Sequence, residues 1–81
     1  MTELEKAIQY VRENKDWTDA EEQVAMDDIG KMRCSLSMTR TGEKICDHIN
    51  DLLEEYGEDN GLPEGWWMSE VDDVEEIFWE L

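Results

Sequence analysis

The residues of this chain best suited to chemistry are the carboxylates of its C-terminal half, and the chemistry they offer is binding of positive charge. Residues 45–81 contain 13 Asp and Glu and no Lys or Arg, whereas residues 1–44 contain 10 acidic and all 7 basic side chains. The formal net charge is −16. A chain of this charge repels nucleic acids, so we expect its partner to be a basic protein surface. The carboxylates expected to make this contact are Asp47, Asp51, Glu54, Glu55, Glu58, Glu70, Asp72, Asp73, Glu75 and Glu76.

Five of these carboxylates lie on one face of a predicted helix. Apolar residues from Ile45 to Tyr56 recur at helical spacing over about 100° of arc, and the acids from Asp47 to Glu58 lie on the reverse side. Side chains three or four residues apart have Cβ atoms roughly 5–6 Å apart, and successive phosphates of a nucleic-acid strand are roughly 6–7 Å apart. The pattern predicts a nucleic-acid mimic that inhibits a DNA- or RNA-binding protein. The Glu70–Glu76 acids are expected to extend the row.

The C-terminal tryptophans suggest a second hypothesis. Closure of a core short of Leu and Ile accounts best for the aromatic residues as a group. Trp66 and Trp67 are adjacent, however, so both cannot point inward from a regular helix or strand, and one of them is expected to reach a partner. The alternative function is therefore a structural accessory protein that assembles, as a homo-oligomer or with other chains, through Trp66, Trp67 and Trp79.

Other kinds of chemistry have little support in the sequence. Cys34 and Cys46 do not form a CxxC pair, and His48 is the only histidine, so we expect free thiols and no structural metal site. An EF-hand alignment fails because it places Tyr56 at the first ligand position. No motif of catalysis or of cofactor binding is found, and we expect a protein that is not an enzyme. The lack of a signal or a membrane-spanning run predicts a cytoplasmic protein.

The length of 81 residues allows one small acidic domain over residues 1–81. Thr2 with Glu5, and Thr18 with Glu21, have capping-box spacing and predict the starts of two helices. The second helix is expected to carry an apolar stripe as far as Leu36, with close packing or a bend at Gly30.

A turn is expected over residues 39–42, with Thr41 as the cap of the third helix. Gly57 is expected to end that helix, and residues 58–65 to form a loop. Residues 66–81 fit a helix with a capping signal at Ser69, but also a hairpin turning at residues 72–73. The predicted fold class is all-α, a small bundle of three to four short helices; the alternative is three helices plus a C-terminal β-hairpin, an α+β fold.

Overall fold

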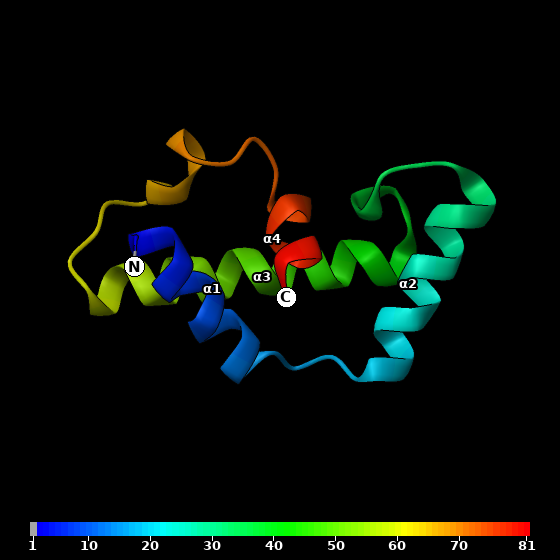
Figure 1. The fold of residues 1–81 in the computed structure, drawn as a ribbon, viewed down its shortest axis with the longest axis horizontal. Coiled ribbons are helices and arrows are strands. Elements are labelled where there is room, and N and C mark those ends of the chain that lie inside the picture. The colour runs from blue at the N-terminus through cyan, green and yellow to red at the C-terminus, as the bar shows by residue number, and fades with distance from the viewer. Residues whose placement is uncertain (1) are drawn as a thin grey trace.

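The computed structural model describes residues 2–81 and contains four α-helices and two short 3₁₀ helices within that range (Figure 1). The predicted all-α bundle is confirmed, and residues 66–81 form helices rather than a hairpin. None of the helices in this range combines the length and apolar character needed to cross a bilayer. In chain order the elements are α1 (Glu3–Asn14), α2 (Asp19–Met32), η1 (Leu36–Met38), α3 (Arg40–Asp59), η2 (Trp66–Ser69) and α4 (Val74–Glu80).

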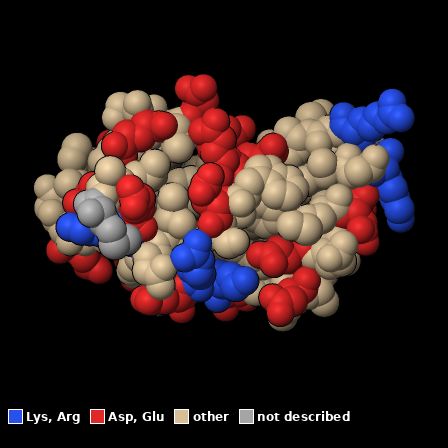
Figure 2. Space-filling view, in the orientation of Figure 1, with Lys and Arg blue, Asp and Glu red and all other residues tan. Residues whose placement is uncertain are grey.

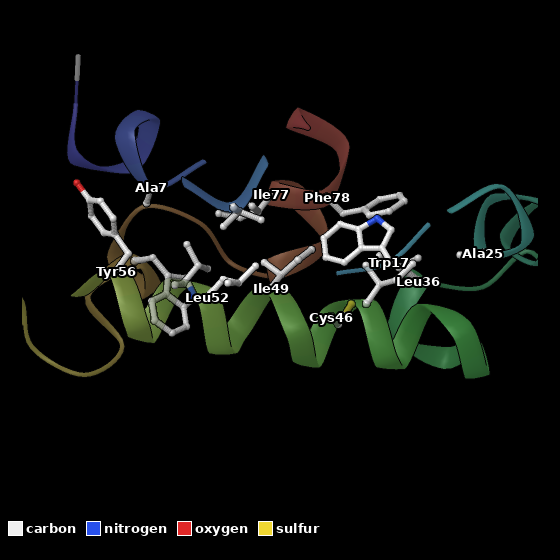
Figure 3. Close-up of a cluster of buried hydrophobic side chains, with 14 residues drawn as sticks. Ala7, Trp17, Ala25, Leu36, Cys46, Ile49, Leu52, Tyr56, Ile77 and Phe78 are labelled. Atoms are coloured by element: carbon white, nitrogen blue, oxygen red, sulfur yellow. The ribbon is translucent and has the colours of Figure 1, made fainter. Parts of the chain in front are cut away.

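The long helix α3 is the element on which the others pack. It contacts α1, α2, η1 and α4, and its buried residues include Ile45, Ile49 and Leu53. Figure 3 shows the labelled core side chains on one side of α3, with α1 and α4 lying over that side. The opposite side of α3 is left to its polar residues. The molecule is elongated, 39 × 23 × 20 Å, with α3 along its length (Figure 1).

Two of the predicted helix starts are confirmed in atomic detail. The Thr2 side chain accepts a hydrogen bond from the Glu5 backbone N–H at 3.2 Å. At the start of α2, Thr18 accepts from the Glu21 N–H at 3.1 Å, and the Glu21 carboxylate accepts from the Thr18 N–H at 3.2 Å. Both caps satisfy backbone N–H groups that the first helical turn leaves without partners.

The boundaries of the central helices differ from expectation. The helix α2 ends at Met32 because Arg33 adopts a left-handed conformation (φ 51°), so Leu36 enters the core from η1 instead of α2. Gly30 is exposed and has no atom near the position where a Cβ would lie, so the close packing expected there is absent. The cap of α3 is Thr39, not Thr41, and the expected turn is the first turn of this helix.

Gly42 and Gly57 both lie buried within α3, at sites of close approach. Thr39 Oγ1 donates to the Leu36 carbonyl at 3.0 Å and accepts from the Gly42 N–H at 2.9 Å, which brings η1 against the start of α3. A Cβ on Gly42 would collide with both of those oxygens. Gly57 does not end the helix as expected; it leaves room for the Trp66 ring.

The C-terminal segment folds back onto α3 through η2 and α4. Gly65, with φ 71°, precedes η2, and Asp73 caps α4 by accepting from the Glu75 N–H at 3.1 Å. The predicted cap at Ser69 is therefore wrong, because Ser69 belongs to η2. Ile77 and Phe78 are buried, and this anchors α4 in the core.

Candidate functional site

Five carboxylates follow one another at steps of four residues along the solvent side of α3, and we call them the acidic row. Each step of four advances about 6 Å along the axis and about 40° around it, so the row extends over about 24 Å. All five side chains are exposed. The members are Glu43, Asp47, Asp51, Glu55 and Asp59.

The acidic row extends the predicted set by one residue at each end. Asp47, Asp51 and Glu55 were predicted. Glu43 was not predicted, although a cap at Thr41 already places it in the first turn of the helix, and Asp59 was missed because the helix was expected to end at Gly57. The four-residue step itself was the signal that could have found them. Glu58 is also exposed, one turn from Glu54, beside a hollow of about 500 Å³ that also borders Glu64.

Basic side chains do not neutralise the acidic row. Within residues 2–81 the ion pairs are those of Lys15, whose Nζ lies 3.9 Å from Asp19 and 3.6 Å from Glu22. Figure 2 shows acidic side chains over much of the face on which α1 and α4 lie, with basic ones gathered mainly where α2 ends and at two other places. On α3 the five carboxylates of the row are exposed, and among the described residues no basic side chain forms an ion pair with them.

Some of the predicted carboxylates are occupied by contacts within the chain. Glu54 is half-buried and accepts from the Gly65 N–H at 3.0 Å, which fixes the loop after α3. Glu75 accepts from the backbone N–H of Leu36 and so ties α4 to η1. Asp73 caps α4, and Glu76 accepts from the Asp72 N–H at 3.3 Å.

The C-terminal acids do not continue the acidic row. The helix α4 packs through Ile77 and Phe78 against the apolar side of α3, whereas the row runs along the other side. Glu70, Asp72, Asp73 and Glu76 are exposed but belong to this separate part of the surface. The expectation of one extended row over both halves is corrected for that reason.

Two tyrosines lie where α1 crosses the end of α3. The rings of Tyr10 and Tyr56 pack edge to face with centroids 5.8 Å apart. The Tyr56 hydroxyl donates to Glu3 Oε1 at 2.7 Å, and burial together with this carboxylate raises the pKa of Tyr56 to about 12. Burial, followed by hydrogen bonding to Glu55, raises the pKa of Tyr10. Glu55 is therefore the member of the row that also contacts α1.

The tryptophan predictions require one correction. Trp67 is 2% exposed and belongs to the core, so it does not present a surface to a partner. Trp66 is half-buried, and its Nε1–H donates to the Leu53 carbonyl at 3.1 Å. The two rings pack edge to face with centroids 6.2 Å apart, Trp67 within the core and Trp66 at its edge. The most exposed tryptophan is Trp79, at 50%.

The thiols and the histidine do not form a recognisable reactive group. Cys34 and Cys46 are free, as expected. Burial and the nearby carboxylates, Asp73 foremost, raise the pKa of Cys46 to about 11, which disfavours the reactive thiolate. The His48 ring packs edge to face on Trp17, with centroids 5.8 Å apart, beside a small hollow of about 220 Å³. In residues 2–81 no three His, Cys, Asp or Glu side chains are grouped to hold a metal ion.

Comparison with protein-family models, with curated proteins and with solved structures gives no match to this chain.

Proposed function

We propose that this protein is a non-catalytic interaction protein that binds a basic protein surface through the acidic row of α3. In its sharpest form the proposal is a nucleic-acid mimic that occupies the binding groove of a DNA- or RNA-binding protein. The observation that carries it is the run of five exposed carboxylates at four-residue steps with no ion pair among the described residues.

The first support is energetic. Like charges at four-residue spacing destabilise a helix by a few tenths of a kcal/mol per pair, so the four neighbouring pairs of the row cost about 1 kcal/mol in total. Small domains have only about 5–15 kcal/mol of stability. Placing one Lys in the row would remove much of this cost, whereas a positive partner surface removes it only in the complex. The row is thus better suited to a bound state than to the free domain.

The second support is geometric. The row lies on a 20-residue helix whose other side is held by the core, so its carboxylates are presented on a rigid element. Their steps of about 6 Å are comparable with the separation of successive phosphates, roughly 6–7 Å. A groove lined by Lys and Arg to hold a phosphate backbone would find charges of the right sign at similar intervals. Association should be fast at low salt and should weaken as salt rises.

The test compares two variants of equal net charge. In the row variant four exposed acids of the row are neutralised by Asp47→Asn, Asp51→Asn, Glu55→Gln and Asp59→Asn. In the control variant four exposed acids elsewhere are neutralised by Glu13→Gln, Asp16→Asn, Asp27→Asn and Glu64→Gln. Tagged wild type and both variants are passed over lysate of the source cells at low salt and eluted with a salt gradient.

We expect the wild type and the control variant to retain the same nucleic-acid-binding protein, released by salt or by added duplex DNA or RNA. The row variant should lose it, with affinity weaker by at least about 100-fold if each neutralised contact contributes about 0.7 kcal/mol or more. Equal loss in both variants would show that only total charge matters. Retention by the row variant, or capture of no nucleic-acid-binding protein, would refute the mimic proposal.

The alternative, assembly through the C-terminal tryptophans, has weaker support. Trp67 is in the core and Trp66 is held by Leu53, which leaves Trp79 as the single well-exposed ring of the three. Sedimentation tests it: assembly predicts an oligomer that grows with protein concentration and is insensitive to salt, and Trp79→Ser should abolish it.

A further inference from the structure

A groove between α1 and α4 leaves apolar surface uncovered on the side of the molecule away from the acidic row. Its volume is about 520 Å³. The helices α1 and α4 lie on the same side of α3 (Figures 1 and 3), and the Arg12 guanidinium links them by donating to the Glu80 carbonyl at 2.9 Å. The apolar lining consists of Leu4, Ile8, Val71, Ile77 and Trp79.

The lining is only partly covered by the protein itself. Ile77 is fully buried and forms the floor, whereas Leu4, Ile8 and Val71 are half-buried and pack against the core from its edge. Trp79 is 50% exposed and is the largest apolar side chain so placed in the described part of the chain. Uncovered apolar surface that adjoins a rim of charge is characteristic of a protein-binding site, and tryptophan is among the residues that contribute most to such contacts.

The rim carries one sign of charge. Every ionisable residue that lines the groove within residues 2–81 is a glutamate, namely Glu5, Glu76 and Glu80, and all three are exposed. Arg12, near the end of the groove, is engaged with Gln9 and with the Glu80 carbonyl and has no ion pair among the described residues. An occupant therefore meets an apolar floor with negative charge around it.

We propose that this groove binds a short segment of a partner protein that presents large apolar side chains flanked by Lys or Arg. The apolar side chains lie between α1 and α4 against Ile8, Val71 and Trp79, and the basic residues meet the three glutamates. Charge complementarity selects this occupant over an acidic or a neutral segment. The site is separate from the acidic row and does not depend on the function proposed for it.

The probe is a short fluorescent peptide with two leucines spaced for one helix face and lysines at the flanking positions. One control peptide has Glu in place of Lys, and a second has Ser in place of Leu. Binding is followed by fluorescence polarisation and by the indole N–H signals of ¹⁵N-labelled protein, with the Trp79 signal assigned through Trp79→Phe. We expect the lysine–leucine peptide to shift the Trp79 signal. The Trp17 signal should not shift, because the Trp17 indole N–H donates a hydrogen bond to Glu22. Neither control peptide should bind.

Two variants of equal charge locate the contact. The rim variant, Glu5→Gln with Glu76→Gln and Glu80→Gln, keeps the side-chain acceptor oxygens and should bind the peptide about tenfold more weakly. The matched variant, Asp47→Asn with Asp51→Asn and Glu55→Gln, should bind within about twofold of wild type because screening limits the reach of those charges.

Three results would overturn the inference. They are binding that leaves Trp79 unshifted, equal binding of the Glu-flanked peptide, and equal loss of affinity in the two variants. A dimer of the wild type that protects Trp79 from solvent would assign the groove to a second copy and would also overturn it. Because the acidic-row substitutions leave this groove intact, failure here and failure of the mimic proposal are separate results.

Discussion

Replacing Gly42 with alanine is the perturbation for which helix propensity and packing predict opposite results. In a helix interior alanine is more stable than glycine by roughly 0.5–1 kcal/mol. Gly42, however, is buried where η1 meets α3, and a Cβ there would collide with the Leu36 carbonyl oxygen and with Thr39 Oγ1. The backbone must shift, since neither neighbour is the free end of a flexible side chain.

The size of the effect follows from the contacts that the shift breaks. Moving Thr39 removes a cap, which costs about 1 kcal/mol, and overpacking a tight site costs about 1–3 kcal/mol. When the gain in helix propensity is subtracted, the free energy of unfolding falls by about 2 kcal/mol. For a domain of this size such a loss lowers the melting temperature by roughly 10 °C.

The matched control is Gly30→Ala, in α2. Gly30 is exposed with no atom near the added Cβ, so propensity alone should act and stabilise by roughly 0.5–1 kcal/mol. Urea titrations and thermal melts followed by far-UV circular dichroism measure the change in stability of each variant. A Gly42→Ala variant that melts at or above the wild-type temperature would refute the packing of η1 against α3.

Three further predictions concern single side chains. Glu75→Ala leaves the Leu36 N–H without its acceptor and should lower the free energy of unfolding by about 1–3 kcal/mol in urea titration; an unchanged midpoint would contradict the α4–η1 tie. Cys34 should react with a thiol reagent well before Cys46, which is buried and has its pKa raised to about 11; equal rates in the folded protein would contradict this. Burial and Glu3 raise the pKa of Tyr56 from 10.0 to about 12, so the folded state keeps a proton that the unfolded state releases, and stability should fall as pH rises between these values. Tyr56→Phe should make the fall in melting temperature shallower over that range, and an identical slope would contradict it.

The parts of the fold that depend on local sequence were predictable. The caps at Thr2 and Thr18 are fixed by groups three residues away, and the apolar face of α3 is set by its own periodicity. The acids of the row follow from the same periodicity. Only the ends of the row were missed: Asp59 because α3 continues past Gly57, which leaves room for the Trp66 ring, and Glu43 although its four-residue step to Asp47 is visible in the sequence.

The parts that depend on distant contacts were not predictable. Nothing local shows that the Glu75 carboxylate binds a backbone N–H 39 residues earlier, or that Glu54 holds Gly65. Glu75 and Glu54 are therefore engaged within the chain, although both were predicted to contact a partner. Likewise, Trp67 is buried from a 3₁₀ turn, whereas the sequence favoured a helix over residues 66–81, with a hairpin as the alternative, and did not show which of the two adjacent rings is buried.

Competition with duplex DNA, or with RNA if the captured protein binds RNA, is the most direct test of the proposal that the acidic row imitates phosphates. A labelled nucleic acid bound to the captured partner is titrated with wild type, with the four-residue row variant and with its charge-matched control. We predict that wild type and control displace the nucleic acid and that the row variant requires at least about 100-fold more protein. Simultaneous binding of protein and nucleic acid, or equal displacement by all three, would contradict the proposal.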